Sequence, residues 1–214
     1  MGTYKKGVLG PFSGKIGTVI GSTWNGIEYM RSLPKASTKA ATELQLNNRA
    51  KFGLANGFLG PIVGLLNLGF KAVALGKTGF NMASSHLISE GITGVYPDFV
   101  INYAKVLFSK GALEGVWSVA AVSSLPGQIE ISWEDNSGSG TAKSTDKLVA
   151  LVYNPAKSKF VYTLENGAAR SAGADIIAMP AQFAGDTVQL WIAFMNSDKT
   201  SFSTSMYVGE IEVS

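Results

Sequence analysis

The run IEISWEDNSG, residues 129–138, alternates apolar and polar side chains as far as Trp133 and then changes to turn-forming residues. Alternation with a period of two is typical of a β-strand that buries one face. Six more short β-prone runs share this part of the chain, at residues 116–123, 148–153, 159–164, 175–179, 187–194 and 205–213. Turn formers such as Asn166-Gly167 separate them, and this spacing is typical of an antiparallel sandwich. We therefore expect a β-sandwich over residues 115–214, with Trp133 and Trp191 in its core.

The first 39 residues follow a different pattern. Two β-prone runs, residues 16–24 and 27–31, flank Asn25-Gly26 in a segment rich in glycine and lysine. Asn-Gly between such runs is the strongest short-range sign of a hairpin, because a type I′ turn needs positive φ at both central positions. A lone hairpin is only marginally stable in water. We therefore expect residues 1–39 to form a basic hairpin arm that packs on another surface.

Residues 40–114 predict a mainly helical region. Thr42 and Gln45 have the spacing of a capping box, which marks a helix start. Apolar residues then recur at near-helical intervals as far as Phe58, and Pro61 suits the first turn of a second helical stretch. The sequence therefore predicts helices that follow one another directly after the arm.

The later part of this region is less regular. We expect the second helical stretch to end at Gly76, and a third covers residues 83–90 before Gly91. Residues 100–107 fit a helix or a strand. The chain as a whole predicts an α+β fold with an N-terminal β-hairpin arm, a central helical region and a C-terminal antiparallel β-sandwich. The last part resembles immunoglobulin and fibronectin type III domains.

No group of residues in the sequence completes a catalytic or metal site. The absence of cysteine excludes disulfides, thiolate metal sites and cysteine nucleophiles, and His86 is the only histidine. Gly76-Lys77-Thr78 resembles the end of a phosphate-binding loop but lacks that loop's first glycine. Glu134-Asp135 begin a run that is typical of a solvated turn. We predict a protein that is not an enzyme and that needs no cofactor or metal.

The most apolar part of the chain, residues 52–75, is interrupted by glycine, proline, asparagine and lysine. A spanning helix needs about 20 mostly apolar residues. We predict a buried helical region and no membrane span, with a membrane-interacting helix as the less favoured alternative. Because no unbroken apolar stretch follows Lys6, we expect no secretory signal. The expected location is the cytoplasm or an assembled particle, with export by another route left open.

Charge is divided unevenly along the chain. Residues 1–115 hold 12 Lys and Arg against 5 Asp and Glu, a balance of +7, whereas residues 116–214 hold 6 against 10, a balance of −4. The two parts sum to the net charge of +3. A basic front and an acidic back favour head-to-tail attraction between copies of the protein. The basic front also suits nucleic acid, which carries the opposite charge.

Basic and aromatic residues in the front of the chain form a candidate nucleic-acid surface. Its charged members are Lys5, Lys6, Lys15, Arg31, Lys35, Arg49 and Lys51. The interpretation that we favour is structural: Trp24 and Tyr29 form a cross-strand pair near the hairpin turn, and the basic side chains stay solvated. Nucleic acid is therefore not the favoured partner.

The motifs GPFSGKIG (residues 10–17), GSTW (21–24), YMR (29–31) and RAKF (49–52) resemble the sequence pattern of an uncharacterised protein family from Bacteroidota. YAKV (103–106), SKG (109–111) and TDK (145–147) extend the resemblance over essentially the whole chain. The family has no assigned activity, so the resemblance implies no site. More loosely, the glycine-rich opening is similar to that of small phage-type structural proteins, which favours a role in assembly.

The function that we expect is a non-enzymatic structural subunit that self-associates, as in a virion-like, filament or surface assembly. The arm would add to a sheet edge or groove of a neighbouring copy. Its contact residues would be Ile16, Val19, Trp24, Ile27, Tyr29 and Arg31. The expected partner is a second copy of the chain, and other proteins remain alternatives.

Two other functions remain open. The sandwich could bind a carbohydrate or protein ligand through aromatic side chains, although most of these are expected to point into the core. The aromatic residues considered are Tyr153, Phe160, Tyr162 and Phe202. The basic arm could instead contact nucleic acid, in which case binding would depend steeply on salt.

Overall fold

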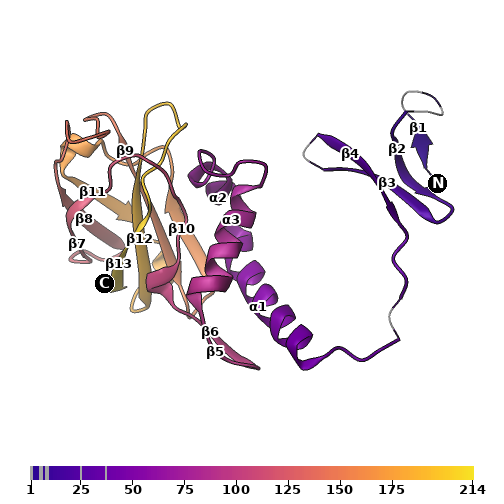
Figure 1. Ribbon diagram of the computed structural model, residues 1–214. Helices are drawn as coiled ribbons and strands as arrows, with labels where there is room; N and C mark the ends of the chain where they lie inside the picture. Colours follow the sequence, from indigo (N-terminus) through magenta and orange to yellow (C-terminus); the bar gives the residue numbers. More distant parts are fainter. Residues whose placement is uncertain (1, 5–6, 8–9, 25, 37) are drawn as a thin grey trace. The chain divides into compact units, whose positions relative to one another are not determined.

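The computed structural model describes residues 2–4, 7, 10–24, 26–36 and 38–214. The chain divides into two compact units, Met1–Thr42 and Glu43–Ser214, and Figure 1 shows the elements of each. Asn25, at the expected hairpin turn, and the candidate contact residues Lys5 and Lys6 lie outside the described residues.

The first unit is a four-stranded antiparallel sheet in the order β1-β2-β3-β4. Its strands are β1 (Thr3–Tyr4), β2 (Phe12–Ile16), β3 (Val19–Trp24) and β4 (Ile27–Ser32). The predicted hairpin is present as β3 and β4, with Gly26 at a φ of 79°. The first predicted run is divided, however, because Gly17 at a φ of 57° turns the chain between Ile16 and Val19. The arm is therefore a sheet and more than a lone hairpin.

The second unit has three layers, which Figure 1 shows side by side. Helices cover one face of a four-stranded sheet with the order β10-β9-β12-β13, and a three-stranded sheet with the order β11-β8-β7 covers the other. The strands are β7 (Trp117–Val122), β8 (Gln128–Glu134), β9 (Lys147–Asn154), β10 (Lys159–Thr163), β11 (Ala174–Ala178), β12 (Thr187–Met195) and β13 (Met206–Glu212). All seven predicted strands are present, and the antiparallel sandwich is confirmed.

The two central strands of the larger sheet are buried on both faces. Leu151 on β9 and Trp191 on β12 pack against the helices, whereas Leu148 and Leu190 on the same strands pack against the other sheet. This double burial explains why both strands are nearly continuous apolar runs rather than alternating ones. The helices and the sandwich therefore share a core. Trp133 and Trp191 are buried, as expected.

The helical layer begins directly after Thr42, where the capping-box spacing predicted a helix start. Its segments are α1 (Glu43–Leu59), the 3-10 turn η1 (Gly60–Ile62), α2 (Val63–Gly69), α3 (Gly79–His86) and the π-helical turn η2 (Leu87–Gly91). The face of these segments that meets the sheet carries Ala55, Phe58, Ile62 and Leu66, all of which are buried. The third helical stretch ends at Gly91, as predicted.

The prediction that the second helical stretch continues to Gly76 is wrong, because α2 ends at Gly69. Gly69 packs so closely on the Phe108–Ser109 backbone that a β-carbon would lie 2.4 Å from the Phe108 carbonyl oxygen. The chain then turns, and the Thr78 hydroxyl accepts a hydrogen bond from the Asn81 amide at the start of α3. Lys77 therefore precedes a helix start instead of following a helix end.

Residues 100–107, which fitted a helix or a strand, are divided between two kinds of structure. A short hairpin of β5 (Ile92–Val95) and β6 (Asp98–Ile101) comes first, and the 3-10 turn η3 (Tyr103–Lys105) follows it. The sequence did not predict this hairpin inside the helical region. Gly94, at a φ of 95°, lies opposite Phe99, where a β-carbon would collide with the Asp98 carbonyl oxygen.

By length and composition alone, one helical stretch in the described part of the chain, Glu43–Gly69, is apolar enough to cross a membrane. Its best 18-residue window has a mean hydropathy of 1.4, and 39% of that window is buried within the protein. Because the buried part belongs to the core shared with the sheet, the contacts favour a core helix, in line with the sequence-based expectation of a buried helical region.

Candidate interaction surfaces

The register of β3 and β4 determines which arm residues share a face. Trp24 lies opposite Ile27, Ser22 opposite Tyr29, and Ile20 between Lys15 and Arg31. Cross-strand partners point to the same side of a sheet. One face, which we call the arm face, therefore carries Lys15, Ile20, Ser22, Trp24, Ile27, Tyr29 and Arg31.

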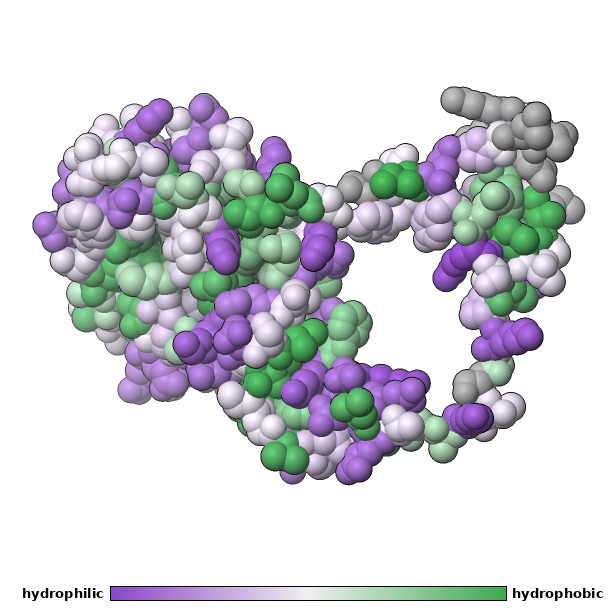
Figure 2. Space-filling view, in the orientation of Figure 1, coloured by the Kyte–Doolittle hydropathy of each residue, from purple (hydrophilic) through white to green (hydrophobic). Residues whose placement is uncertain are grey.

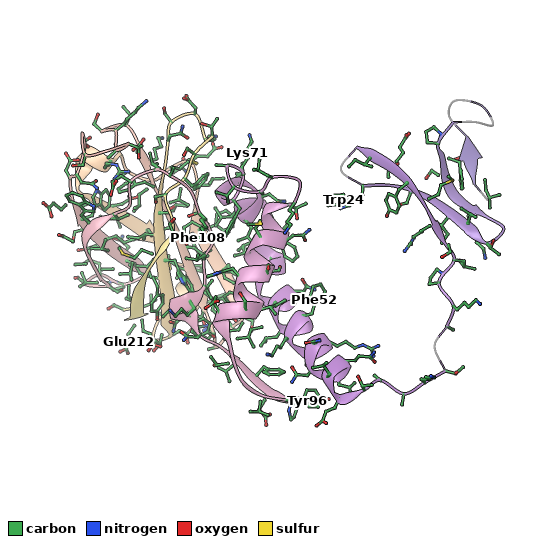
Figure 3. The ribbon with its side chains drawn as sticks, in the orientation of Figure 1. Trp24, Phe52, Lys71, Tyr96, Phe108 and Glu212 are labelled. Carbon is green, nitrogen blue, oxygen red and sulfur yellow. The ribbon has the colours of Figure 1, made fainter. Side chains whose placement is uncertain are left out.

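The expected direct pair of Trp24 and Tyr29 is wrong. Trp24 lies opposite Ile27 and Tyr29 lies opposite Ser22, so Tyr29 is only a diagonal neighbour of Trp24. Figure 3 shows Trp24 beside the tip of this hairpin. Both aromatic side chains remain substantially exposed, at 46% for Trp24 and 43% for Tyr29.

The other face of the arm is also apolar and exposed. Ile16 lies opposite Val19, and Met30 lies opposite Gly21, so the two assembly residues Ile16 and Val19 do not share a face with Trp24, Ile27, Tyr29 and Arg31. Val19 and Met30 line a groove of about 710 Å³ with the segment that follows β4. The predicted assembly residues thus divide between both faces of the sheet.

Very little of the arm is buried. Among its described residues, 2–4, 7, 10–24, 26–36 and 38–42, only Gly21 is buried. Its exposed large apolar residues are Ile16, Val19, Trp24, Ile27, Tyr29, Met30 and Leu33, and Figure 2 shows hydrophobic residues on the surface of this sheet. A sheet normally packs at least one face on a core, and within its own unit this sheet covers neither face with a core.

The described candidate nucleic-acid residues belong to both units. Lys15 and Arg31 flank Ile20 on the arm face, and Lys35 lines the groove beyond β4. Arg49 and Lys51 belong to α1 in the second unit, where the Lys51 ammonium lies 5.1 Å from the centre of the Phe99 ring. A basic surface made from all of these residues therefore stays a prediction.

The outer face of the three-stranded sheet forms a shallow apolar groove of about 290 Å³. Its cross-strand rows are Val122–Glu130–Ile176 and Ala120–Ser132–Ala174. We call this surface the sandwich groove. Val122 is 52% exposed and Ile176 is 59% exposed, so Glu130 lies partly buried between two uncovered apolar side chains.

Residues 11–209 match the model of a family of unknown function, DUF6266. The chain belongs to this family. The expected membership of an uncharacterised family is confirmed at that level, whereas an origin in Bacteroidota and a similarity to phage proteins stay predictions. No match was found among curated proteins.

Solved structures similar to this DUF6266 chain include fibronectin type III domains, each 12% identical. The fn3 domain of the human collagen alpha-1(XX) chain has a TM-score of 0.32, over 48% of this chain and 87% of that one. The FN1–FN3 domains of chicken CNTN1 have a TM-score of 0.34, over 49% of this chain and 33% of that one. The fn3 domain of human contactin 1 has a TM-score of 0.31, over 57% of this chain and 93% of that one. Similarity of this degree says nothing about function.

The sandwich of this DUF6266 chain holds a buried ion pair. The side chains of Arg170 and Asp146 have no exposed surface, and a guanidinium nitrogen lies 3.2 Å from the carboxylate. The guanidinium also donates to Asn136 Oδ1 at 2.6 Å and stacks over the Phe194 ring at 3.7 Å. Burial lowers the pKa of Arg170, while the nearby Asp146 carboxylate acts in the opposite direction. These contacts join β12 to the loops that carry Asn136, Asp146 and Arg170, so their role is structural.

The aromatic residues considered for ligand binding mostly pack into the protein. Phe202 is 2% exposed, and Tyr153 and Phe160 pack on Phe58 of α1 with ring centres 5.0 and 5.2 Å away. Tyr162 alone of these four is exposed, at 43%. The sandwich of this DUF6266 chain therefore presents no cluster of these aromatic side chains to a ligand.

The residues examined for catalysis also have structural contacts. The Nε2 atom of His86 lies 3.1 Å from the Lys105 carbonyl oxygen. The Asp135 carboxylate accepts hydrogen bonds from the Ser137 amide and hydroxyl, which lower the pKa of Asp135. Among the described residues no group of three or more His, Cys, Asp and Glu could hold a metal ion.

Proposed function

We propose that this protein is a non-enzymatic structural subunit that self-associates through its N-terminal sheet. One observation carries the proposal: the described part of the arm exposes seven large apolar side chains and buries only Gly21. A unit of about 40 residues rarely folds without a disulfide, a metal or a partner, and this chain has no cysteine. A surface contributed by another molecule would therefore stabilise the sheet.

The distribution of charge supports a second copy as that molecule. The first 42 residues hold 6 Lys and Arg against 1 Glu, and the remaining residues hold 12 Lys and Arg against 14 Asp and Glu. A positive arm and a weakly negative body attract each other between copies. Such a contact is heterologous, because different surfaces of the two copies meet, and heterologous contacts build rings or filaments.

The edge of the arm supports the same proposal. β4 pairs with β3 on one side, and its six residues are all exposed. An exposed edge strand presents unpaired amide and carbonyl groups on which another chain can add a strand. Trp24, Ile27 and Tyr29 would supply the apolar contact beside those hydrogen bonds.

Sedimentation velocity of the full chain across the micromolar range tests the proposal. We expect the wild type to form oligomers and the variant Trp24→Thr/Ile27→Thr to dissociate toward monomer, because threonine keeps the strand preference and removes apolar surface. The matched control is Val95→Thr/Val100→Thr, which changes two exposed apolar residues of the β5–β6 hairpin. A monomeric wild type, or equal effects of both variants, would contradict the proposal.

A further inference from the structure

The sandwich groove contains a carboxylate without a partner. Glu130 is flanked directly by Val122 and Ile176 on the neighbouring strands, and it is partly buried between them. Within residues 38–214 and the other described parts of the chain, its side chain makes no hydrogen bond or ion pair. A carboxylate among apolar side chains gains most from a cation that arrives together with an apolar surface.

The next row of the groove is lined by small side chains. Ala120, Ser132 and Ala174 lie side by side across the three strands, next to the Val122–Glu130–Ile176 row. The small row leaves a depression between larger neighbours, which matches the groove of about 290 Å³. A depression of this kind can receive a protruding aromatic or branched side chain.

The arm face presents the complementary chemistry. Arg31 lies at one end of this face beside Ile20, and Trp24, Ile27 and Tyr29 lie toward the other end. Within the described part of the chain, Arg31 has no hydrogen-bond or ion-pair partner. A guanidinium group binds a carboxylate through two parallel hydrogen bonds, which suits the partly buried Glu130.

We propose that the sandwich groove receives the arm face of a second copy of the chain, with Arg31 of one copy paired to Glu130 of the other. This inference rests on the proposed function and names a groove, rather than a sheet edge, as the acceptor of the arm face. Both surfaces are faces of β-sheets, and two sheets pack face to face at about 10 Å with interdigitating side chains. The apolar side chains of the arm then cover Val122 and Ile176, and each copy donates one arm and accepts another.

Charge reversal with mixing tests the pair. Arg31→Glu places two carboxylates at the contact and Glu130→Lys places two cations there, so each variant alone is expected to associate about tenfold more weakly or worse. When the two variants are mixed, the arm of the Arg31→Glu variant meets the groove of the Glu130→Lys variant. The unchanged arm of the Glu130→Lys variant meets the unchanged groove of the Arg31→Glu variant. Both contacts then join opposite charges, and we expect the mixture to associate again. Sedimentation velocity at equal total concentration measures the recovery.

Two further variants test whether the effect on association is specific to the charge of Glu130 in the sandwich groove. Glu212→Lys makes the same charge change at an exposed residue of β13, outside the groove, and we expect it to associate like the wild type. Glu130→Gln keeps the shape and removes the charge, so it should weaken association less than Glu130→Lys and flatten its salt dependence. If Glu130→Lys associates normally while Trp24→Thr/Ile27→Thr does not, the arm associates elsewhere, and this inference fails while the proposed function stands. If the wild type is monomeric, both fail.

Discussion

Arg170 shows how a single residue can stabilise this fold without any sequence signal. Its guanidinium holds five polar contacts with Asp146, Asn136 and the carbonyl oxygens of Glu114 and Gly115. The Trp133 indole also donates to its carbonyl oxygen at 2.8 Å. A buried charge is expensive unless it is paired in this way.

Asp146→Asn should destabilise the protein by about 3–5 kcal/mol, because it leaves the Arg170 charge buried without a counter-charge. Urea unfolding of the full chain measures the change. The matched control is Glu165→Gln, which removes an equivalent charge from the exposed pair with Lys199 and should change stability little. Equal losses for the two variants would show that burial of the Arg170 pair does not matter.

At the residue scale, the sequence predicted burial correctly where the hydrophobicity of a side chain alone determines whether it is buried. Trp133 and Trp191 were expected in the core because they lie inside β-prone runs, and both are buried. Arg170 could not be found in this way. Its partner Asp146 is 24 residues away, and both lie between the predicted strands, where no pattern marks them.

At the scale of elements, α2 and α3 pack closely through glycine. A β-carbon on Gly79 would lie 2.3 Å from the Leu66 carbonyl oxygen, whereas one on Gly57 in α1 would meet no atom within 4 Å. Both glycines are helical, so intrinsic helix preference favours alanine at each. Alanine at Gly57 therefore reports the helix preference of the backbone alone, whereas alanine at Gly79 adds the cost of a steric clash.

Gly79→Ala should lower the stability of the protein by about 1–3 kcal/mol, because the added methyl group forces α2 and α3 apart. Gly57→Ala should raise it by about 0.5–1 kcal/mol, as expected for a helical position with open space. Thermal unfolding of both variants checks the pair. A stabilised Gly79→Ala variant would mean that the two helices are not held at this distance.

The sequence predicted elements well where a pattern repeats and poorly where a single close contact decides. The seven strands of the sandwich follow from short β-prone runs separated by turn residues. The end of α2 coincides with the close approach of Gly69 to the Phe108 backbone, which no periodicity records. The hairpin of β5 and β6 and the added strands β1 and β2 are short, and short strands give weak patterns.

At the scale of the whole molecule, three carboxylates make stability depend on pH. Hydrogen bonds lower the pKa of Asp186 through Lys157, of Glu165 through Lys199 and of Asp135 through Ser137. A group whose pKa is lower in the folded state stabilises that state above its unfolded pKa, about 3.9 for Asp. The contribution is lost as the pH falls through the lower, folded value.

The melting temperature should therefore fall as the pH is lowered from 7 through the range below about 4. Asp186→Asn should be less stable than the wild type at pH 7, because it loses the contact with Lys157. The difference should shrink as Asp186 of the wild type becomes protonated. Calorimetry at a series of pH values measures both curves, and a constant difference at every pH would rule out the assigned pKa shift.

The arm face and the sandwich groove each combine residues from several strands, so they too are features of the whole molecule. The sequence indicated an arm that needs a surface, but it placed all six assembly residues in one hairpin contact. The register instead distributes them over two faces, with Ile16 and Val19 opposite the arm face. The sandwich groove was not predicted, because Val122, Glu130 and Ile176 come from three separate strands. No local pattern marks an outward-facing row of that kind as a site.

Hydrogen exchange of the full chain at increasing protein concentration tests the central claim most directly, since it reports whether the arm is covered by another copy. We predict that amides of residues 19–32 exchange more slowly as concentration rises, while those of the buried strands β9 and β12 stay unchanged. Exchange of residues 19–32 that does not change with concentration would contradict the account, because the arm would then be equally exposed, or equally protected, within a single chain.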